Sequence, residues 1–192
     1  MTLLLSRDDV QSLLTMQDAI QIVEEAFRQL ALGNVIMPQR TVIRVAQHGG
    51  TYLGMPAYIG GEVDALAVKV VSVYANNPGQ YNLPTTIGTL LLNDPRTGAP
   101  LAVMDASYLT AVRTGAVTGV ATQHLARKDA KRVGIFGAGV QAQTQLWAVC
   151  SVRAVESANV YDPDAKDIES RSRVFVILAA DGPLELRSNA WR

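Results

Sequence analysis

The sequence predicts an α/β protein in which an α+β domain precedes a smaller domain built around a parallel sheet. Three observations predict this class. Before residue 126, apolar residues recur at helical spacing and then in the pattern of strands. Further on, the apolar segment Arg132–Phe136 leads through a glycine turn into a helix-forming segment. A second apolar segment, Ala158–Tyr161, follows that helix, as in a β-α-β unit.

Two helices are predicted near the N-terminus. Ser6, Asp8 and Asp9 are suited to capping a helix that begins near Asp8. The segment Met16–Leu32 repeats apolar residues at helical spacing and ends at Gly33. This pattern predicts an amphipathic helix with one buried face.

Strands are predicted to follow, separated by glycine pairs and turns. The predicted strands are Thr41–Val45, Tyr52–Tyr58 and Ala65–Tyr74, and then Ile87–Asp94 and Pro100–Asp105, which form a hairpin around Pro95–Gly98. The next segment, Tyr108–Leu125, is helical and rich in small residues, which suit close packing between the two parts of the chain. We therefore expect a domain boundary near 126–130, with domains 1–126 and 127–192.

The glycine turn predicts a dinucleotide-binding domain of the Rossmann type. Gly137 is suited to a tight turn with positive φ, and Gly139 lets the backbone approach a pyrophosphate. Ala142 replaces the third glycine of the motif and still permits close packing of helix on strand. Free N–H groups at the start of the helix, at about 140–150, would face the phosphates. Asp162 lies about 20 residues on, where the ribose hydroxyls need an acceptor.

The Rossmann domain is expected to be incomplete. A full domain has two halves, and only residues 163–192 follow Asp162, so at most one half is present. If the apolar segment Val174–Ala179 is a third strand, residues 165–173 must supply the crossover, which usually takes a dozen or more residues. The alternative is an irregular tail.

Composition excludes several classes of function. The 17 basic and 17 acidic side chains balance, which disfavours nucleic acid and anionic membranes as partners. Cys150 is the single cysteine, so neither an internal disulfide nor a zinc site is expected. We expect no signal peptide and no membrane span, and the cytoplasm is the expected location.

Three cations are candidates for binding a carboxylate. Lys69 interrupts the most apolar predicted strand, where a buried ammonium is costly unless it is paired or binds an anion. The alternative is an edge-strand lysine on a solvated face. Arg40 and Arg113 are each more typical of a surface when considered alone, but with Lys69 they could grip a carboxylate. His48 and His124 lack a nearby partner in the sequence and receive no catalytic role.

A set of ordered motifs resembles the ornithine cyclodeaminase/mu-crystallin family. The motifs are Met55-Pro-Ala, Val68-Lys-Val, Tyr74-Ala-Asn-Asn-Pro78, Leu83-Pro-Thr-Thr86, Leu92-Asn-Asp-Pro-Arg-Thr-Gly98, Leu109-Thr-Ala-Val-Arg-Thr-Gly-Ala116 and Gly137-Ala-Gly-Val-Gln-Ala142. The resemblance spans about 1–164. It implies a homodimer with an N-terminal substrate and dimerisation domain, NAD(H) or NADP(H) as cofactor, and amino or cyclic imino acids as substrates. The implied chemistries are cyclising deamination, alanine dehydrogenation and ketimine reduction, which include lyase and oxidoreductase reactions.

The resemblance also implies roles for individual residues. Arg40, Lys69 and Arg113 resemble the residues that hold the substrate carboxylate, and Met55 lines the same pocket. Contacts with the cofactor are implied for Thr85 on the nicotinamide side, for Arg113 and Thr114, for the phosphate turn of Gly137, Ala138, Gly139, Val140 and Gln141, and for Asp162 at the ribose. Because an acid at Asp162 would repel a 2′-phosphate, NAD is expected in preference to NADP.

The chain departs from the family in two places. Ornithine-processing members carry a carboxylate two residues before the Met-Pro pair, where this chain has Leu53. The region that carries the catalytic aspartate in the family has no match in the divergent tail 165–192, as expected for a truncated copy. Three hypotheses therefore stand: an NAD-dependent amino-acid or imino-acid enzyme with Lys69 as a catalytic group, a non-catalytic binding protein like mu-crystallin, and an inactive fragment.

Overall fold

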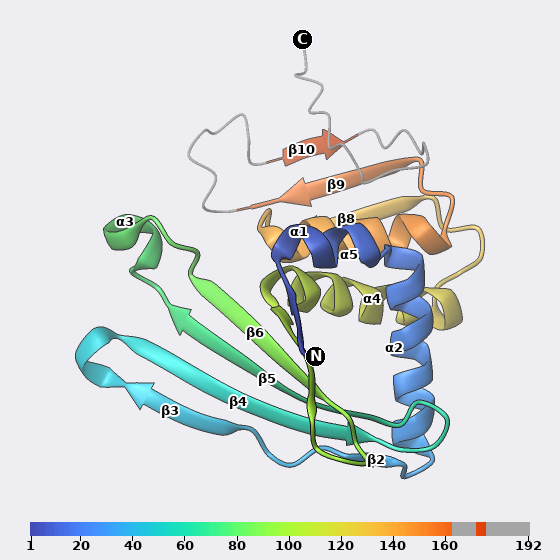
Figure 1. Ribbon diagram of the computed structural model, residues 1–192. Coiled ribbons are helices and arrows are strands. Elements are labelled where there is room, and N and C mark those ends of the chain that lie inside the picture. Colours follow the sequence, from blue (N-terminus) through green and yellow to red (C-terminus); the bar gives the residue numbers. More distant parts are fainter. Residues whose placement is uncertain (163–171, 176–192) are drawn as a thin grey trace. The chain divides into compact units, whose positions relative to one another are not determined.

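The computed structural model describes residues 1–162 and 172–175, and the chain forms two compact units (Figure 1). The first unit contains Met1–Thr15 and Glu25–Thr110, and the second contains Met16–Glu24 and the chain from Ala111 onward. Two long helices, α2 (Met16–Ala31) and α4 (Ser107–Leu125), each contribute to both units. The division at 110–111 therefore falls inside α4, whereas the sequence suggested a boundary in the loop at 126–130 that follows this helix.

The predicted N-terminal helices are both present. Helix α1 (Arg7–Leu13) begins with a capping box, in which the Asp9 N–H donates to Ser6 Oγ at 3.2 Å and the Ser6 N–H donates to Asp9 Oδ2 at 2.8 Å. Helix α2 ends two residues before Gly33, which adopts a φ of 78°. Helix α1 begins one residue before the predicted start near Asp8, and α2 begins at the predicted Met16 and ends one residue before Leu32.

A seven-stranded sheet forms the centre of the first unit. Its strands are β1 (Leu3–Leu5), β2 (Val35–Ile36), β3 (Thr41–Val45), β4 (Gly50–Ile59), β5 (Ala65–Tyr74), β6 (Thr86–Asn93) and β7 (Pro100–Asp105). The order is β1-β7-β6-β5-β4-β2, and β3 also pairs with β4. All pairs are antiparallel except β1 with β7. The predicted strands and the β6–β7 hairpin are confirmed, and β1 and β2 were not predicted because they are only three and two residues long.

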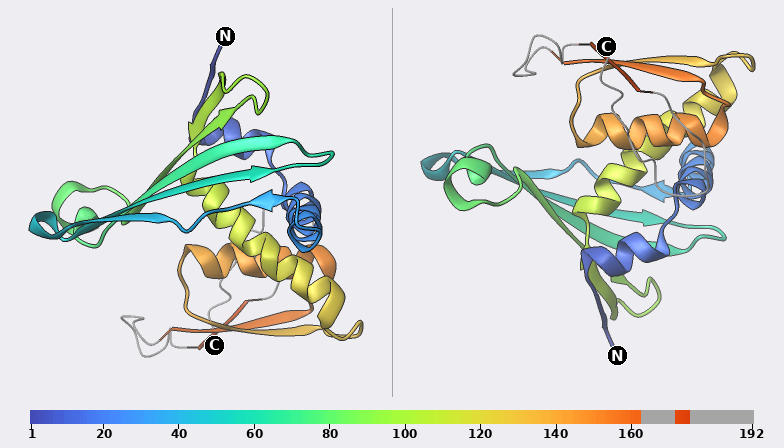
Figure 2. Two further views of the ribbon diagram at one scale, coloured as in Figure 1. Left: turned by 90° about the horizontal axis from the view of Figure 1, so that it is seen from below. Right: turned by 90° about the horizontal axis from the view of Figure 1, so that it is seen from above.

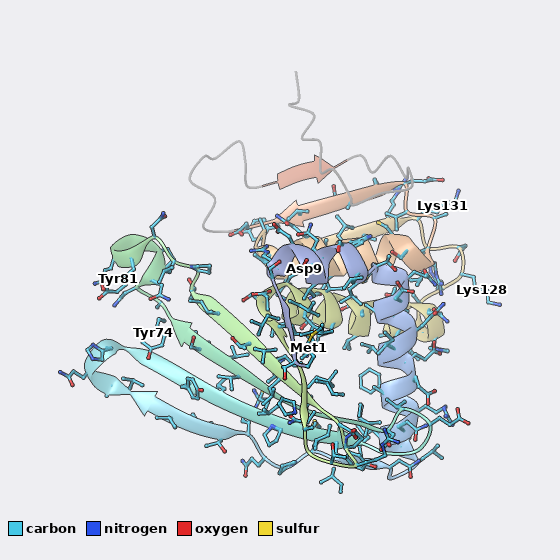
Figure 3. All side chains as sticks on the ribbon, in the orientation of Figure 1. Met1, Asp9, Tyr74, Tyr81, Lys128 and Lys131 are labelled. Carbon is cyan, nitrogen blue, oxygen red and sulfur yellow. The ribbon has the colours of Figure 1, made fainter. Side chains whose placement is uncertain are left out.

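Short helices lie in two loops of the first unit. The 3₁₀-helix η1 (Ala46–His48) precedes β4, and α3 (Asn77–Tyr81) lies between β5 and β6. Gly50, the first residue of β4, is paired with Tyr74, and a Cβ at position 50 would collide with the Tyr74 ring. Figure 3 labels Tyr74, the last residue of β5, and Tyr81, the last residue of α3.

The second unit contains the expected β-α-β arrangement. Strand β8 (Arg132–Phe136) leads into α5 (Val140–Val152) and then into β9 (Ser157–Tyr161), which pairs with β8 in parallel. In both views of Figure 2, α5 lies along one face of this small sheet. The Rossmann-type half-domain predicted from the glycine turn is therefore present.

The third strand differs from the parallel strand considered above. Strand β10 (Ser172–Phe175) pairs with β9, but the pairing is antiparallel. Residues 162–171 connect the two strands, and a parallel pair needs a crossover of a dozen or more residues. A connection of this length allows only the antiparallel return. The rest of the predicted strand 174–179 lies outside the described residues.

Helix packing in the second unit depends on small residues. Leu146 of α5 and Ala158 of β9 are 2% and 0% exposed and form a core cluster with Val133 and Ile135 of β8. A Cβ on Gly115 of α4 would lie 2.6 Å from the carbonyl carbon of Thr144 on α5. The small residues of α4 therefore allow close contact with α5 inside this unit.

Two polar contacts link elements of the second unit. The Arg153 guanidinium, just after α5, donates to the Thr122 carbonyl at 2.8 Å and the Ala126 carbonyl at 3.0 Å near the end of α4, and to the Val152 carbonyl at 2.8 Å. His124 of α4 lies 2.6 Å from Glu24 of α2 through Nε2 and Oε1. His124 lacks a partner nearby in the sequence, but the fold supplies one 100 positions away.

Candidate functional site

The glycine turn between β8 and α5 has the conformation predicted for a phosphate-binding turn. Gly137 has a φ of 94°, a region that L side chains rarely adopt. Its N–H donates to the Tyr161 carbonyl at 2.7 Å, which fixes the turn to the end of β9. A Cβ at position 137 or 139 would meet no atom within 4 Å. The positive φ of position 137 thus explains why it is a glycine. At Gly139, the missing side chain leaves open space beside the turn.

Among the residues that the structure describes, no N-cap side chain forms a hydrogen bond with the N-terminus of α5. Gly139 is its N-cap residue and provides no side-chain hydrogen bond, and the first turn of α5 carries no acidic residue. Unpaired N–H groups and the positive end of the helix dipole favour an anion at such a position. Together with the open space at Gly139, these features fit a pyrophosphate, and Gly137–Gln141 are the residues that would hold it.

Asp162 lies beside the glycine turn. Its Oδ2 accepts a hydrogen bond of 2.7 Å from the Ala138 N–H, which belongs to that turn. The carboxylate is half-buried and follows directly after β9. The structure therefore brings the predicted ribose acceptor and the predicted phosphate turn together. The same hydrogen bond also gives Asp162 a structural role, because it stabilises the position of the turn. The ribose contact itself stays a prediction.

An aromatic pair marks the same end of the small sheet. Phe136 and Tyr161 are the last residues of β8 and β9, and their rings meet edge to face with centroids 6.2 Å apart. This contact, together with the Gly137 hydrogen bond, holds the two strand ends that carry the turn and Asp162. The carboxyl ends of parallel strands are where ligands bind in open α/β sheets.

Three predicted substrate residues lie in one row across the seven-stranded sheet. Met55 of β4 is directly opposite Lys69 of β5. Opposite residues of an antiparallel pair project from the same face, with Cβ atoms about 5 Å apart. Arg40 directly precedes β3, whose first ladder pair joins Thr41 to Gly54. Arg40 is exposed and lies one residue outside the ladder; extending the register by one residue would bring it opposite Met55.

Lys69 belongs to the interior of the sheet. Strand β5 lies between β4 and β6, so the alternative of an edge-strand lysine is wrong. The side chain is half-buried. Its cross-strand neighbours are Met55 and Leu90, and Val71, two residues along the same strand, is 6% exposed. Lys69 is therefore a cation on an otherwise apolar part of the sheet.

Leu53 also belongs to the apolar surface around Lys69. It lies two residues before Met55 on β4, and hence on the same face of the sheet. Its partners across the strands are Val71 on β5 and Val42 on β3. No acidic side chain occupies these positions next to the Lys69 row.

Thr85 lies at a different part of the sheet. It directly precedes β6, and its carbonyl accepts a hydrogen bond of 2.8 Å from the Tyr74 N–H at the end of β5. Lys69 and Tyr74 are five residues apart on β5, which corresponds to about 17 Å along the strand. Thr85 is thus outside the Lys69 row, as expected if the two residues contact different parts of the ligands.

Arg113 and Thr114 lie on α4, in the part of the helix that belongs to the second unit. Arg113 is exposed and Thr114 is half-buried. Arg40 and Lys69 belong to the first unit, so the joint grip of three cations on one carboxylate stays a prediction.

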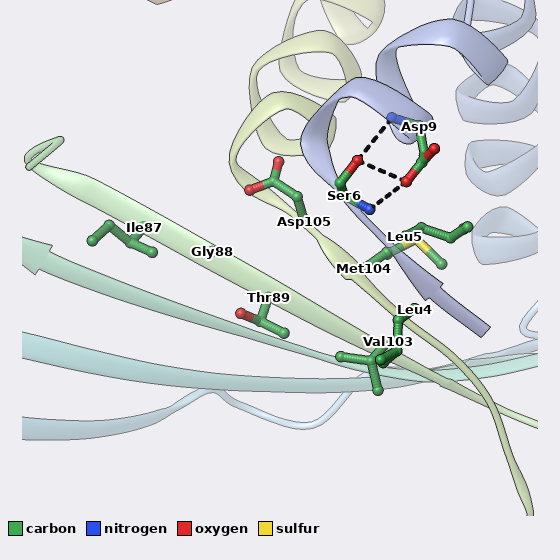
Figure 4. Close-up of a pocket in the computed structure, with 10 residues that line it drawn as sticks. All are labelled: Leu4, Leu5, Ser6, Asp9, Ile87, Gly88, Thr89, Val103, Met104 and Asp105. Atoms are coloured by element: carbon green, nitrogen blue, oxygen red, sulfur yellow. Dashed lines mark hydrogen bonds between the residues drawn. The ribbon is translucent and has the colours of Figure 1, made fainter. Parts of the chain in front are cut away.

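A hollow of about 500 Å³ lies elsewhere in the first unit (Figure 4). None of the predicted site residues lines it. Its two acids act as helix caps: Asp9 in the capping box of α1, and Asp105, whose Oδ1 accepts 3.1 Å hydrogen bonds from the Ser107 and Tyr108 N–H groups at the start of α4. The hydrogen bonds from Ser6 lower the pKa of Asp9. We therefore assign these acids to local structure and not to a catalytic centre.

Other kinds of site find no support in the part of the chain that the structure describes. Over residues 1–162 and 172–175, no group of three or more His, Cys, Asp or Glu residues is arranged to hold a metal ion. No helix in these ranges is long and apolar enough to cross a membrane. Burial raises the pKa of the Cys150 thiol to about 11, so this cysteine is a poor nucleophile near neutral pH.

The chain is similar to several proteins of known name. Alanine dehydrogenase from Archaeoglobus fulgidus is 41% identical over 161 residues, which are 84% of this chain and 48% of the relative. Δ1-pyrroline-2-carboxylate reductase from Bacillus cereus is 38% identical, over 83% of this chain and 49% of the relative. The solved structure of Δ1-pyrroline-2-carboxylate reductase from Thermococcus litoralis, in complex with NADH and L-proline, is 54% identical with a TM-score of 0.81, over 86% of this chain and 50% of that one.

The chain spans about half the length of these relatives. The sequence model of the ornithine cyclodeaminase/mu-crystallin family matches residues 1–178, which include the glycine turn, the Lys69 row and Asp162. The chain therefore belongs to the ornithine cyclodeaminase/mu-crystallin family.

Proposed function

We propose that this chain carries the dinucleotide- and carboxylate-binding parts of an NAD-dependent enzyme that interconverts an amino acid and the corresponding imino acid. The observation that carries the proposal is the uncapped N-terminus of α5, which lies beside an open glycine turn tied to Asp162. The relatives named above, an alanine dehydrogenase and two pyrroline-2-carboxylate reductases, support the same class of reaction.

NAD is the proposed cofactor, in preference to NADP. The Asp162 carboxylate lies next to the phosphate turn, where it is suited to accept hydrogen bonds from ribose hydroxyls and would repel a 2′-phosphate. In support, the related Thermococcus litoralis structure contains NADH, and an archaeal alanine dehydrogenase of 41% identity contains NAD.

The proposed chemistry uses the cations of the sheet. When bound, the nicotinamide ring would accept a hydride from the substrate α-carbon, or return it in the reductive direction. Lys69 and Arg40, with Arg113 from α4, would hold the substrate carboxylate and oppose the charge that develops beside it. Lys69 also has the amine needed to carry a proton to or from the substrate nitrogen.

We propose a small apolar side chain for the substrate. Leu53, Val71 and Leu90 surround the Lys69 row, so a second ammonium group on the substrate would meet no carboxylate there. Alanine, proline or their imino counterparts fit this surface better than ornithine or lysine. The variant Leu53→Glu should weaken L-proline or L-alanine binding in calorimetric titrations in the presence of NADH. Unchanged binding would contradict the assignment.

The first test is binding of NADH and NADPH to the 192-residue chain, followed by nicotinamide fluorescence. We expect saturable binding with NADH preferred, and an Asp162→Ala variant that loses this preference. Lys69→Met and Arg113→Met should each abolish turnover of an amino or imino acid while leaving the fold intact, with the exposed Lys128→Met as the control. Wild-type turnover in both variants would refute the proposed roles.

A second candidate is a non-catalytic protein that binds a dinucleotide or a small carboxylate, as the mu-crystallin resemblance implies. NADH binding without turnover of any amino or imino acid would support it, whereas turnover by the purified chain would exclude it. No NADH binding at all would favour the third possibility, an inactive fragment.

We also propose that the chain forms a homodimer. The face of the seven-stranded sheet opposite Lys69 carries Ile43, Tyr52 and Ile87, which are 53%, 41% and 37% exposed. The related archaeal alanine dehydrogenase is a dimer. Sedimentation at several concentrations tests this proposal, and the variant Ile43→Asp should shift the chain toward the monomer.

A further inference from the structure

Asn77 is a buried polar residue in a surface loop. It begins α3 and is 8% exposed, although its neighbours Ala75, Asn76 and Pro78 are exposed. Buried polar side chains in proteins almost always serve a hydrogen bond, because an unpaired one costs free energy. The hydrogen bonds of the Asn77 side-chain amide should therefore explain why this residue is buried.

Asn77 makes three hydrogen bonds to the segment that precedes Thr85, one of which comes from the Asn82 N–H to its backbone carbonyl. Its side-chain Nδ2 donates to the Pro84 carbonyl at 3.0 Å. Its backbone carbonyl accepts from the Leu83 N–H at 3.3 Å. The next peptide group is fixed from the other side, because the Tyr74 N–H donates to the Thr85 carbonyl at 2.8 Å.

These bonds restrain a segment that little else supports. Leu83, Pro84 and Thr85 are all exposed, and Asn82 before them adopts a positive φ of 53°. Ladder pairing of β5 with β6 begins only at Val73 and Thr86. Without the Asn77 amide, the Pro84 carbonyl would lose the hydrogen bond from Nδ2, and the hydrogen bond from the Tyr74 N–H to the Thr85 carbonyl would remain.

We propose that Asn77 is a positioning residue that holds Thr85 in place for contact with the nicotinamide half of the bound dinucleotide. This proposal rests on the proposed function, with Thr85 as the nicotinamide-side contact that the family resemblance implies. Asn77 touches neither the cofactor nor the substrate and acts through the Leu83–Thr85 backbone. An acceptor side chain at position 77 could not replace it, since the Pro84 carbonyl needs a donor.

Calorimetric titration of the 192-residue chain with NADH and with ADP-ribose tests the proposal, because ADP-ribose lacks nicotinamide. Loss of one hydrogen bond and of local order should weaken NADH binding by about threefold to tenfold in Asn77→Ala. Asn77→Asp keeps the shape of the side chain but removes the donor, so it should behave in the same way. ADP-ribose binding should not change in either variant, and Asn76→Ala, at the exposed neighbour, should match the wild-type chain in both titrations.

A double-mutant cycle shows whether the effect passes through Thr85. In a Thr85→Ala background, Asn77→Ala should cause little further loss of NADH affinity. Full additivity, equal weakening of NADH and ADP-ribose, or unchanged NADH binding in Asn77→Ala would each overturn the proposal.

Hydrogen exchange separates failure of this proposal from failure of the proposed function. Amide exchange at Leu83, Thr85 and Thr86 should accelerate in Asn77→Ala and Asn77→Asp but not in Asn76→Ala, whether or not the chain binds NADH. If the wild-type chain binds no NADH, the proposed function is wrong. If Thr85→Ala binds NADH normally, the proposed contact between Thr85 and the nicotinamide half is wrong. If exchange at these amides is unchanged, the positioning role of Asn77 is wrong.

Discussion

The N-termini of α1 and α5 solve the same physical problem in opposite ways. Each helix begins with N–H groups that lack partners within the helix. At α1, Ser6 and Asp9 form a capping box, and Asp8 and Asp9 place two acids in the first turn. At α5, Gly139 offers no side-chain cap and the first turn has no acid. A helix start that the protein itself satisfies contributes to stability, whereas one left open is available to an anionic ligand.

The largest expected effect concerns the turn that leads into α5. Gly137→Val forces a β-branched residue into a φ of 94°, so the turn must change shape. We expect NADH affinity to fall by about 100-fold. Fluorescence titration measures this loss, and circular dichroism should show that the helices remain. Normal NADH affinity would mean that the turn does not hold the cofactor.

A smaller effect is expected from making α5 resemble α1. Gln141→Glu places an acid in the first turn of α5, where it should stabilise the helix slightly and repel a pyrophosphate. NADH affinity should fall by about fivefold to tenfold without loss of stability. Gln145→Glu, about one turn further along α5, is the control and should bind NADH nearly as the wild-type chain does. Equal NADH affinities in the wild-type chain and in both variants would show that the uncapped start of α5 does not bind the cofactor.

The converse change removes the cap of α1. Ser6→Ala loses the side-chain acceptor of the Asp9 N–H and should lower the free energy of unfolding by about 1 kcal/mol. Urea denaturation measures the change. NADH affinity should stay the same, because the capping box has no proposed part in the cofactor site. A weaker affinity for NADH would show that the two helix ends are not independent.

The smallest expected effect is a pH dependence of the stability that the capping box of α1 provides. Hydrogen bonds from Ser6 lower the pKa of Asp9 below 3.8, so their contribution to stability is present above that pH and is lost as the pH falls through the lower value. The stability difference between the wild-type chain and Asp9→Asn should therefore shrink as the pH falls from about 5 to about 3. Thermal unfolding at several pH values tests this, and a constant difference would contradict it.

Local patterns allowed the most reliable predictions from sequence. The capping box, the β6–β7 hairpin and the strand-turn-helix around Gly137 each depend on residues close together in the chain, and the structure contains all three. Asp162 was expected near the turn because of its spacing, and its bond to the Ala138 N–H agrees with that expectation.

Contacts between distant residues could not be predicted in the same way. The parallel pairing of β1 with β7, and the contact of His124 with Glu24, join segments about 100 positions apart. Lys69 could be recognised as unusual from its apolar neighbours, but only the strand order shows that β5 is interior. Asn77 belongs to the Tyr74-Ala-Asn-Asn-Pro78 motif, but the motif does not indicate that its side chain is buried, which became visible only in the folded loop.

Arg153 has a consequence for the electrostatics of α5. Its guanidinium neutralises carbonyl groups at the C-terminal ends of both α4 and α5, through the Thr122, Ala126 and Val152 oxygens. The negative pole of α5 is thus compensated by a fixed cation, whereas the first turn at its positive pole carries no acid of its own. The Asp162 carboxylate beside this pole accepts from the Ala138 N–H, just before the helix, so an incoming phosphate would meet helix N–H groups whose dipoles are already oriented toward it.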